Sequence, residues 1–182
     1  MMRLYCDGGC RPNPGISAFA YKIVTDDAEI LQSGYLGTNI TNNESEFAAI
    51  YCGLVDMIEH YELPLYVFSD SQFVTHLLAG VYTTKDLRFT YMREIILNMT
   101  HGNTEFVWKN RRNSHIADCD KLCDHVLCGM PHLYDEGLVK LNKIGYNFIS
   151  EARALLGQSM SEVDPRHRVV GAEFDIQTSP LS

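Results

Sequence analysis

The chain has 182 residues, a formal net charge of −8, and contents of 46% hydrophobic and 21% charged residues. This composition excludes a disordered or fibrous protein, and the length suits one globular domain with an appendage. No apolar run approaches the roughly 20 residues that a membrane-spanning helix needs. A strand pattern begins at the N-terminus and leaves no room for a signal peptide, and the cysteines form no CxxC pair. We therefore expect a cytoplasmic protein whose thiols stay reduced.

The first part of the chain predicts three strands followed by a helix. The strands are expected at residues 3–7, 17–24 and 29–36, and turn-forming residues separate them, so they form an antiparallel meander. A Thr-Asn-Asn segment then supplies N-cap chemistry for a helix over about 44–60, whose apolar residues recur at helical spacing.

Strands and helices alternate over the next part of the chain. The predicted order is a buried strand, two helices, a strand and a helix, at residues 63–70, 71–79, 87–99, 104–109 and 115–128. Three antiparallel strands followed by strands that helices separate predict an α/β fold, with a mixed five-stranded sheet flanked by helices. Ligands commonly bind at the carboxyl ends of neighbouring strands in such sheets.

Four acidic residues fall at the ends of these predicted elements. Asp7 ends the first strand, Glu46 lies in the first turn of the first helix, Asp70 ends the fourth strand, and Asp120 lies in the last helix. Each residue alone would be an ordinary turn or helix cap. Brought together, the carboxylates would repel one another unless they held cations, and hard divalent cations held by few carboxylates are typical of phosphoryl-transfer sites. The set therefore predicts a divalent metal site.

Two of these residues have an acidic neighbour that competes for the same role. Glu44 precedes Glu46 in the same helix, and we expect Glu44 to face solvent. In the last helix, the spacing of the apolar residues puts Asp120 at the edge of the buried stripe, whereas the same spacing counted from Asp118 meets charged residues. We therefore prefer Asp120 to Asp118 as the fourth ligand.

Four sequence blocks carry a resemblance to a known family. In chain order they are DGGCRPNPG, TNNESE, SDSQFV and a late DKLC, and their order and spacing are similar to those of the type 1 ribonuclease H family over roughly residues 1–128. The resemblance implies a ribonuclease H-like fold. It also implies an endonuclease that hydrolyses the RNA strand of RNA–DNA hybrids by a two-metal-ion mechanism, leaving 3′-hydroxyl and 5′-phosphate ends.

The resemblance further implies roles for individual residues. The implied metal ligands are Asp7, Glu46, Asp70 and Asp120. The implied cofactor is a pair of Mg2+ ions, with Mn2+ as a substitute. The implied contacts to the RNA–DNA hybrid are Cys10, Asn13, Asn43 and Gln72. Polar side chains of this kind suit a reading of ribose 2′-hydroxyls in the minor groove.

The chain departs from the family where many relatives carry a histidine, in the loop after the fifth strand. Alignment of Lys109 with the family's strand end puts Arg111 at the position of this histidine. His115 lies a few residues later and is the alternative substitute. The sequence alone leaves both residues open.

The last part of the chain lies outside the resemblance. We expect a catalytic domain over residues 1–129 and a C-terminal extension over residues 130–182. A broad apolar stripe predicts a helix over about 138–157 that packs on the catalytic domain, followed by a partly irregular tail. A docking peptide for a partner protein is the alternative for the tail, since QTSPL loosely resembles short sliding-clamp ligands.

Three other functions compete with hybrid cleavage. Related sites cut DNA in resolvases and transposases, but the candidate 2′-hydroxyl contacts favour the hybrid. A non-catalytic hybrid-binding module would not need all four carboxylates, and a regulatory protein would act through the extension. The acidic net charge indicates modest rather than tight binding of nucleic acid, because phosphate binding is largely electrostatic.

Overall fold

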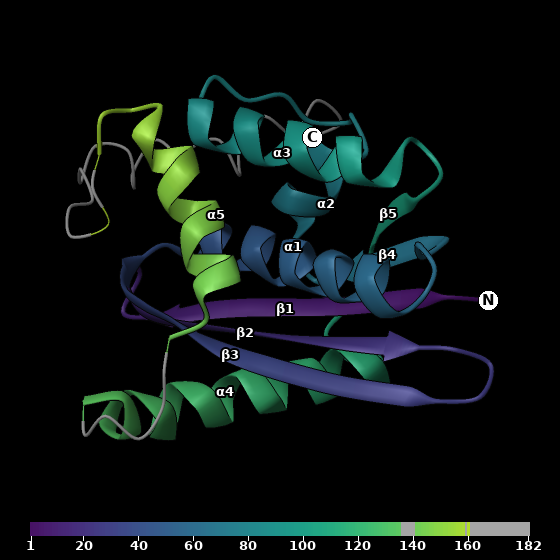
Figure 1. Cartoon of the computed structure of the whole chain (residues 1–182), viewed down its shortest axis with the longest axis horizontal. Helices are drawn as coiled ribbons and strands as arrows, with labels where there is room; N and C mark the ends of the chain where they lie inside the picture. Colours follow the sequence, from purple (N-terminus) through teal and green to yellow (C-terminus); the bar gives the residue numbers. More distant parts are fainter. Residues whose placement is uncertain (136–140, 159, 161–182) are drawn as a thin grey trace.

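A computed structural model describes residues 1–135, 141–158 and 160 of the chain. A five-stranded sheet in the order β3-β2-β1-β4-β5 lies at its centre (Figure 1). The strands are β1 (Arg3–Arg11), β2 (Gly15–Val24), β3 (Glu29–Ile40), β4 (Tyr66–Ser69) and β5 (Glu105–Trp108). β1, β2 and β3 are antiparallel, whereas β4 runs parallel to β1 and β5 runs parallel to β4. The predicted mixed sheet is confirmed.

Helices cover both faces of this sheet (Figure 1). They are α1 (Asn42–His60), α2 (Gln72–Leu78), α3 (Leu87–Thr100), α4 (Ser114–Asp135) and α5 (Lys143–Ala154). α4 packs against one face, and α1 covers the other face with α2, α3 and α5 around it. The larger apolar cluster includes Leu4 of the sheet and Leu54 of α1, and the smaller one includes Ala20 of the sheet and Val126 of α4. The sheet is therefore buried on both faces.

Two strands are longer than predicted. β1 continues past Asp7 to Arg11, because the residues after Asp7 stay paired with β2. The predicted turn is thereby reduced to residues 12–14. β3 continues to Ile40, which pairs with Gly15 of β2. Asp7 consequently lies inside a long strand, and the glycines that follow it allow close packing rather than a turn.

The helices before the extension agree more closely with prediction. α1, α2 and α3 begin and end within two residues of the predicted positions, and α4 continues to Asp135 instead of ending near residue 128. All six cysteines are free, and four of them are buried, whereas Cys10 is half-buried and Cys128 is exposed. In the described ranges, no helix has both the length and the apolar character needed to span a membrane.

The helix predicted at 138–157 is shorter at both ends. Asn142 is the N-cap of α5, since its Oδ1 accepts a hydrogen bond of 2.9 Å from the N–H of Gly145, and the helix ends at Ala154. Residues 138–140 and the tail 161–182 lie outside the described residues. α5 packs on α1, α3 and β3, with the ring of Phe148 stacked on Tyr51 at a centroid distance of 4.1 Å. The predicted packing of this helix on the preceding part of the fold is confirmed.

The expectation that Glu44 faces solvent is wrong. Its side chain is fully buried and lies within 2.6 Å of the Arg153 guanidinium of α5. Burial raises the pKa of this carboxyl, but the charges of Arg153 and Arg88 and a hydrogen bond from the backbone of Thr41 more than offset it, so the pKa is lowered. Helical periodicity did not show this environment, because Arg153 comes from an element far along the chain.

Gly8 of β1 fixes how closely α1 approaches the sheet. A Cβ at this position would lie 2.6 Å from the backbone nitrogen of Glu46 and closer still to the carbonyl oxygen of Ser45. Both neighbours are helix backbone, so they cannot turn away as a flexible side chain would. Only glycine lets the first turn of α1 lie this close to β1.

We expect Gly8→Ala to destabilise the protein by about 3 kcal/mol, the upper end for overpacking, and to displace Glu46. Gly9→Ala is the matched control, because a Cβ at Gly9 meets its nearest neighbour at 3.7 Å, an ordinary contact. Urea unfolding of both variants measures the difference. Equal stability of the two variants would contradict the close approach of α1 to β1.

Candidate active site

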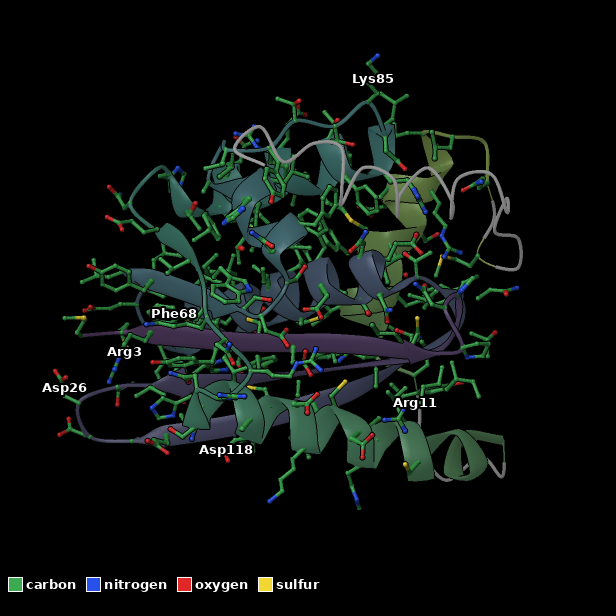
Figure 2. All side chains as sticks on the ribbon, turned by 180° about the vertical axis from the view of Figure 1, so that it is seen from behind. Arg3, Arg11, Asp26, Phe68, Lys85 and Asp118 are labelled. Carbon is green, nitrogen blue, oxygen red and sulfur yellow. The ribbon has the colours of Figure 1, made fainter. Side chains whose placement is uncertain are left out.

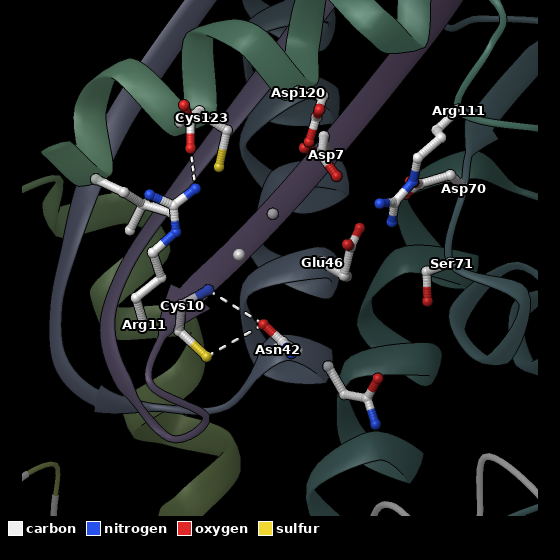
Figure 3. Close-up of a pocket in the computed structure, with 15 residues that line it drawn as sticks. Asp7, Cys10, Arg11, Asn42, Glu46, Asp70, Ser71, Arg111, Asp120 and Cys123 are labelled. Carbon is white, nitrogen blue, oxygen red and sulfur yellow. Dashed lines mark hydrogen bonds and ion pairs between the residues drawn. The ribbon is translucent and has the colours of Figure 1, made fainter.

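Three carboxylates from separate elements meet beside the middle of β1 and the carboxyl end of β4 (Figure 3). The parallel pairing of the two strands sets Cys6 opposite Ser69 and so brings Asp7 next to Asp70. Glu46 reaches the same place from α1. One carboxylate oxygen from each of Asp7, Glu46 and Asp70 lies within 4.8 Å of the others. The structure therefore brings together three of the four predicted ligands within the span of one metal site.

Asp120 approaches this group from α4, on the other side of the sheet (Figure 3). It lines the same cavity of about 320 Å³ as Asp7, Glu46 and Asp70, and its charge helps to raise the pKa of Asp7. Its own side chain is exposed. The fourth carboxylate thus lies at the open side of the cavity, where it can reach a ligand bound to the other three.

Local capping interactions hold the two helices that carry or follow the ligands. Thr41 is the N-cap of α1 and forms a capping box with Glu44, in which each side chain accepts from the other's backbone N–H. Ser71 is the N-cap of α2 and accepts from the N–H of Val74, which fixes the chain directly after Asp70. The sequence signals that predicted these helix starts therefore also determine where the carboxylates lie.

Burial and mutual repulsion shift the titration of the cluster. Burial, followed by the charges of Asp70 and Asp120, raises the pKa of Asp7 to about 8. Burial and the charges of Asp7 and Asp70 also raise the pKa of Glu46, although hydrogen bonds from Ser69 and the Gly8 backbone oppose this. Such a cluster gains stability from a cation. Its hard oxygen donors, gathered within bonding reach of one point, fit a divalent ion such as Mg2+.

The predicted substrate contacts divide into two groups. Cys10 and Asn43 line the cavity, whereas Asn13 and Gln72 are exposed and lie outside its lining. Asn42, which the sequence analysis did not single out, joins them. Its Oδ1 accepts a hydrogen bond of 3.1 Å from the Cys10 backbone N–H (Figure 3). Its own backbone N–H donates to Asn13 Oδ1 at 3.1 Å. The sequence signal that could have identified Asn42 is its position between Thr41 and Asn43, in the segment that starts the helix.

The structure separates the two candidates for the loop histidine position. Arg111 lies at the cavity, with its Nε 3.2 Å from Asp70 Oδ2 and its side chain 73% exposed. His115 instead packs on Tyr5, at a ring centroid distance of 4.5 Å, and its Nδ1 lies 3.9 Å from Glu29 of the β2–β3 hairpin. Arg111 is therefore the residue next to the carboxylates, and His115 is not.

The rival Asp118 lies away from the cavity. Figure 2 shows Asp118 near the start of α4. Arg11, which pairs with Asp124 at the cavity, lies further along this helix, towards its end. Asp118 accepts a hydrogen bond of 2.7 Å from Lys22 Nζ on β2. This ion pair joins α4 to β2 outside the lining of the cavity.

Asp118→Asn and Asp120→Asn form a matched pair on one helix. If the site cleaves RNA–DNA hybrids as the sequence predicts, we expect Asp120→Asn to lower metal-dependent cleavage about tenfold or more, because it removes a carboxylate from the open side of the cavity. Asp118→Asn should leave cleavage within about twofold, since Asp118 lies outside the cavity lining and Lys22 keeps a second partner, Glu29, at 2.9 Å. Initial rates at saturating Mg2+ measure both, and a larger loss for Asp118→Asn would reverse the assignment.

The comparisons with known proteins agree with this geometry. The family model for RNase H matches residues 1–122. LC11-RNase H1 in complex with an RNA/DNA hybrid is similar in structure, with a TM-score of 0.65 and 24% identity over 72% of this chain and 99% of that chain. RNase H1 from the halophilic archaeon Halobacterium salinarum NRC-1 has a TM-score of 0.62 and 23% identity over 70% of this chain and 97% of that one. A search of curated proteins gives no match. The match to the family model covers well over half of the sequence, and the chain therefore belongs to the ribonuclease H family.

Proposed function

We propose that the protein is a metal-dependent endonuclease that hydrolyses the RNA strand of RNA–DNA hybrids. The observation that carries the proposal is the convergence of Asp7, Glu46 and Asp70 within 4.8 Å, in a chain of the ribonuclease H family. A similar structure holds an RNA/DNA hybrid. The proposed products carry 3′-hydroxyl and 5′-phosphate ends.

The proposed cofactor is a pair of Mg2+ ions, with Mn2+ as a substitute. Asp7, Glu46, Asp70 and Asp120 are the proposed ligands. These carboxylates would hold the ions, which would supply the positive charge needed to activate an attacking water and to stabilise the leaving 3′-oxygen. The protein's part is positioning: β1 and β4 fix Asp7 and Asp70, the first turn of α1 fixes Glu46, and the Ser69 hydroxyl holds the Glu46 carboxylate through a hydrogen bond of 3.3 Å.

The polar edge of the cavity suits the minor groove of a hybrid. We propose that Cys10, Asn13, Asn43 and Gln72 contact the substrate. Asn42 links Cys10 to Asn13 and so keeps this edge in one arrangement. Side-chain amides both donate and accept, which matches the ribose 2′-hydroxyl that distinguishes RNA from DNA. Recognition of this kind follows the shape of the duplex, so little sequence specificity is expected.

The division into a catalytic domain over residues 1–129 and an extension over residues 130–182, the docking of a partner by the tail, and a cytoplasmic location stay predictions.

A panel of labelled duplexes tests the proposed function. We expect the protein with Mg2+ to cut the RNA strand of an RNA–DNA hybrid and to leave RNA–RNA and DNA–DNA duplexes intact. Cleavage of the DNA duplex would favour a resolvase-like enzyme instead. Hybrid binding without cleavage in either Mg2+ or Mn2+ would favour a non-catalytic binding module.

A further inference from the structure

A buried ion-pair cluster joins the extension helix to the helix that carries Glu46. The Arg153 guanidinium of α5 holds both carboxylate oxygens of Glu44, with Nε 2.6 Å from Oε2 and Nη2 2.6 Å from Oε1. Arg88 of α3 approaches Oε2 at 3.4 Å and is itself paired with Asp86 at 2.7 Å. Arg153, Glu44 and Arg88 are 0%, 0% and 1% exposed. Two positive and two negative charges thus balance inside the protein.

This cluster lies in the first turn of α1, directly behind the active site. Glu44 and Glu46 are two residues apart, about 200° around the helix, so their side chains leave it in nearly opposite directions. Glu46 points into the cavity, with Asn42 and Asn43 of the same turn at its edge. Glu44 points to α5. The turn is therefore fixed on one side by Arg153 and carries the site on the other.

Arg153 also fixes the chain on either side of this turn. Its Nη2 donates to the carbonyl oxygen of Asn39 at 2.6 Å, just before the N-cap Thr41, and its Nη1 donates to the carbonyl of Met160 at 3.3 Å. The Glu44 carboxylate in turn accepts from the Thr41 backbone N–H at 2.9 Å. A single guanidinium thereby connects the end of β3, the start of α1 and the extension. Planar, bidentate contacts of this kind define both distance and orientation.

The site needs such a fixed turn, because its carboxylates repel one another. Asp7 lies in β1 and Asp70 directly follows β4, which pairs with β1, so the sheet holds both. Glu46 belongs to a helix end, where packing against Gly8 blocks movement towards the sheet but not away from it. Hydrogen bonds to Asn42 and Glu46 tie the turn to the sheet, and Arg153 restrains it from behind through the short, bidentate contact with Glu44. Divalent ions need ligands held in close geometry.

We propose that Arg153 is a positioning residue for the active site, and that α5 is thereby a working part of the catalytic unit. Arg153 touches neither metal nor substrate and acts through Glu44 on the position of Glu46. The inference rests on the proposed function, since it takes Glu46 as a ligand of divalent ions. It adds a residue outside the segment that matches the family model, which ends at residue 122.

The test compares Arg153→Lys and Arg153→Met with Tyr91→Phe in the full chain. Lysine keeps the buried positive charge but cannot hold both oxygens of Glu44. Tyr91→Phe removes another contact of α5, the hydrogen bond of 2.9 Å from Tyr91 to Glu151, which lies away from the first turn of α1. It is the control for a general loosening of α5.

Metal binding is measured without substrate, by calorimetric titration of Mn2+ into chelator-treated protein well below its melting temperature. We expect Arg153→Lys to weaken binding about tenfold and Arg153→Met to weaken it further, while Tyr91→Phe binds like the wild type. Hydrogen exchange over residues 41–47 should quicken in the Arg153 variants alone. If Arg153→Met does not fold, Arg153→Lys decides.

Two results would overturn the inference. A folded Arg153→Lys variant with wild-type metal affinity and wild-type exchange over residues 41–47 would do so. Equal weakening in Tyr91→Phe would also do so, because Arg153 would then only support the fold. Failure of the proposed function looks different, since the wild type itself would then bind metal without cutting a hybrid.

Discussion

Asp70→Asn is expected to lower hybrid cleavage about a thousandfold or more, and at the same time to raise the melting temperature of the metal-free protein. Loss of a metal ligand removes several kcal/mol of transition-state stabilisation, and about 4 kcal/mol corresponds to a factor of a thousand. The same carboxylate helps to raise the pKa values of Asp7 and Glu46 through repulsion. Its neutralisation therefore relieves strain that the folded protein otherwise bears.

Single-turnover cleavage and thermal unfolding in a chelator measure the two effects together. Asp27→Asn is the control, because it removes the same charge from an exposed position in the β2–β3 turn. Asp27→Asn should change neither the cleavage rate nor the melting temperature by much. An Asp70→Asn variant that keeps more than about a tenth of the activity would show that Asp70 is not a ligand required for catalysis.

The metal-free protein is expected to lose stability as the pH rises from about 5 to about 8, and Mg2+ should remove most of that loss. The pKa of Asp7 is raised from 3.8 to about 8 in the folded state. Between these values the folded protein binds more protons than the unfolded chain, so the free energy of unfolding falls with pH. The stabilisation is full below the unfolded value and is lost as the pH passes through about 8. One such group accounts for a slope of about 1 kcal/mol per pH unit.

Urea unfolding at several pH values, with chelator or with Mg2+, measures this slope. A cation replaces the protons that hold the carboxyl groups together, so the metal-bound protein should show a much smaller slope. Asp7→Asn is the matching variant, because it removes the carboxyl group whose pKa is raised to about 8. The free energy of unfolding of metal-free Asp7→Asn should fall less with pH than that of the wild type. Equal pH dependence in the two proteins would contradict the repulsive cluster.

Local signals predicted the fold well, because strands and helices here follow their intrinsic patterns. The apolar strand that ends in Asp70 and the Thr-Asn-Asn helix start were both found in the expected order. The extent of β1 was misjudged because its Gly and Pro residues suggested a turn directly after Asp7, whereas pairing with β2 carries the strand on to Arg11. Tertiary pairing overrides turn propensity at this point.

The site was predictable where each residue has a local reason for its position. The sequence put Asp7 and Asp70 at predicted strand ends and Glu46 in the first turn of a helix, so element order suggested that they meet, although β1 continues past Asp7. Glu44 was misjudged because its partner Arg153 lies 109 residues away in sequence. The choice between Arg111 and His115 also needed three-dimensional information. The two residues are four positions apart, and the packing on Tyr5 shows that His115, in the first turn of α4, points away from the cavity.

The extension was the part least accessible from sequence. Its apolar stripe correctly indicated a packed helix, but a stripe does not reveal a buried arginine that pairs with another helix. A chain cut after residue 129 would lose Arg153, and the nearest positive charge left to Glu44 among the described residues would be Arg88 at 3.4 Å. An uncompensated buried carboxylate is costly. We therefore expect removal of the extension to destabilise the start of α1.

Analysis of the product ends tests the central claim most directly. A hybrid with a labelled RNA strand is incubated with chelator-treated protein, and Mg2+ is then added back. Attack by a metal-held water predicts cleavage only after Mg2+ is added, with 5′-phosphate and 3′-hydroxyl ends at every cut. Cleavage in the chelator, or products that end in a 2′,3′-cyclic phosphate, would mean that the RNA's own 2′-hydroxyl attacks and that the carboxylate cluster does not act through metal ions.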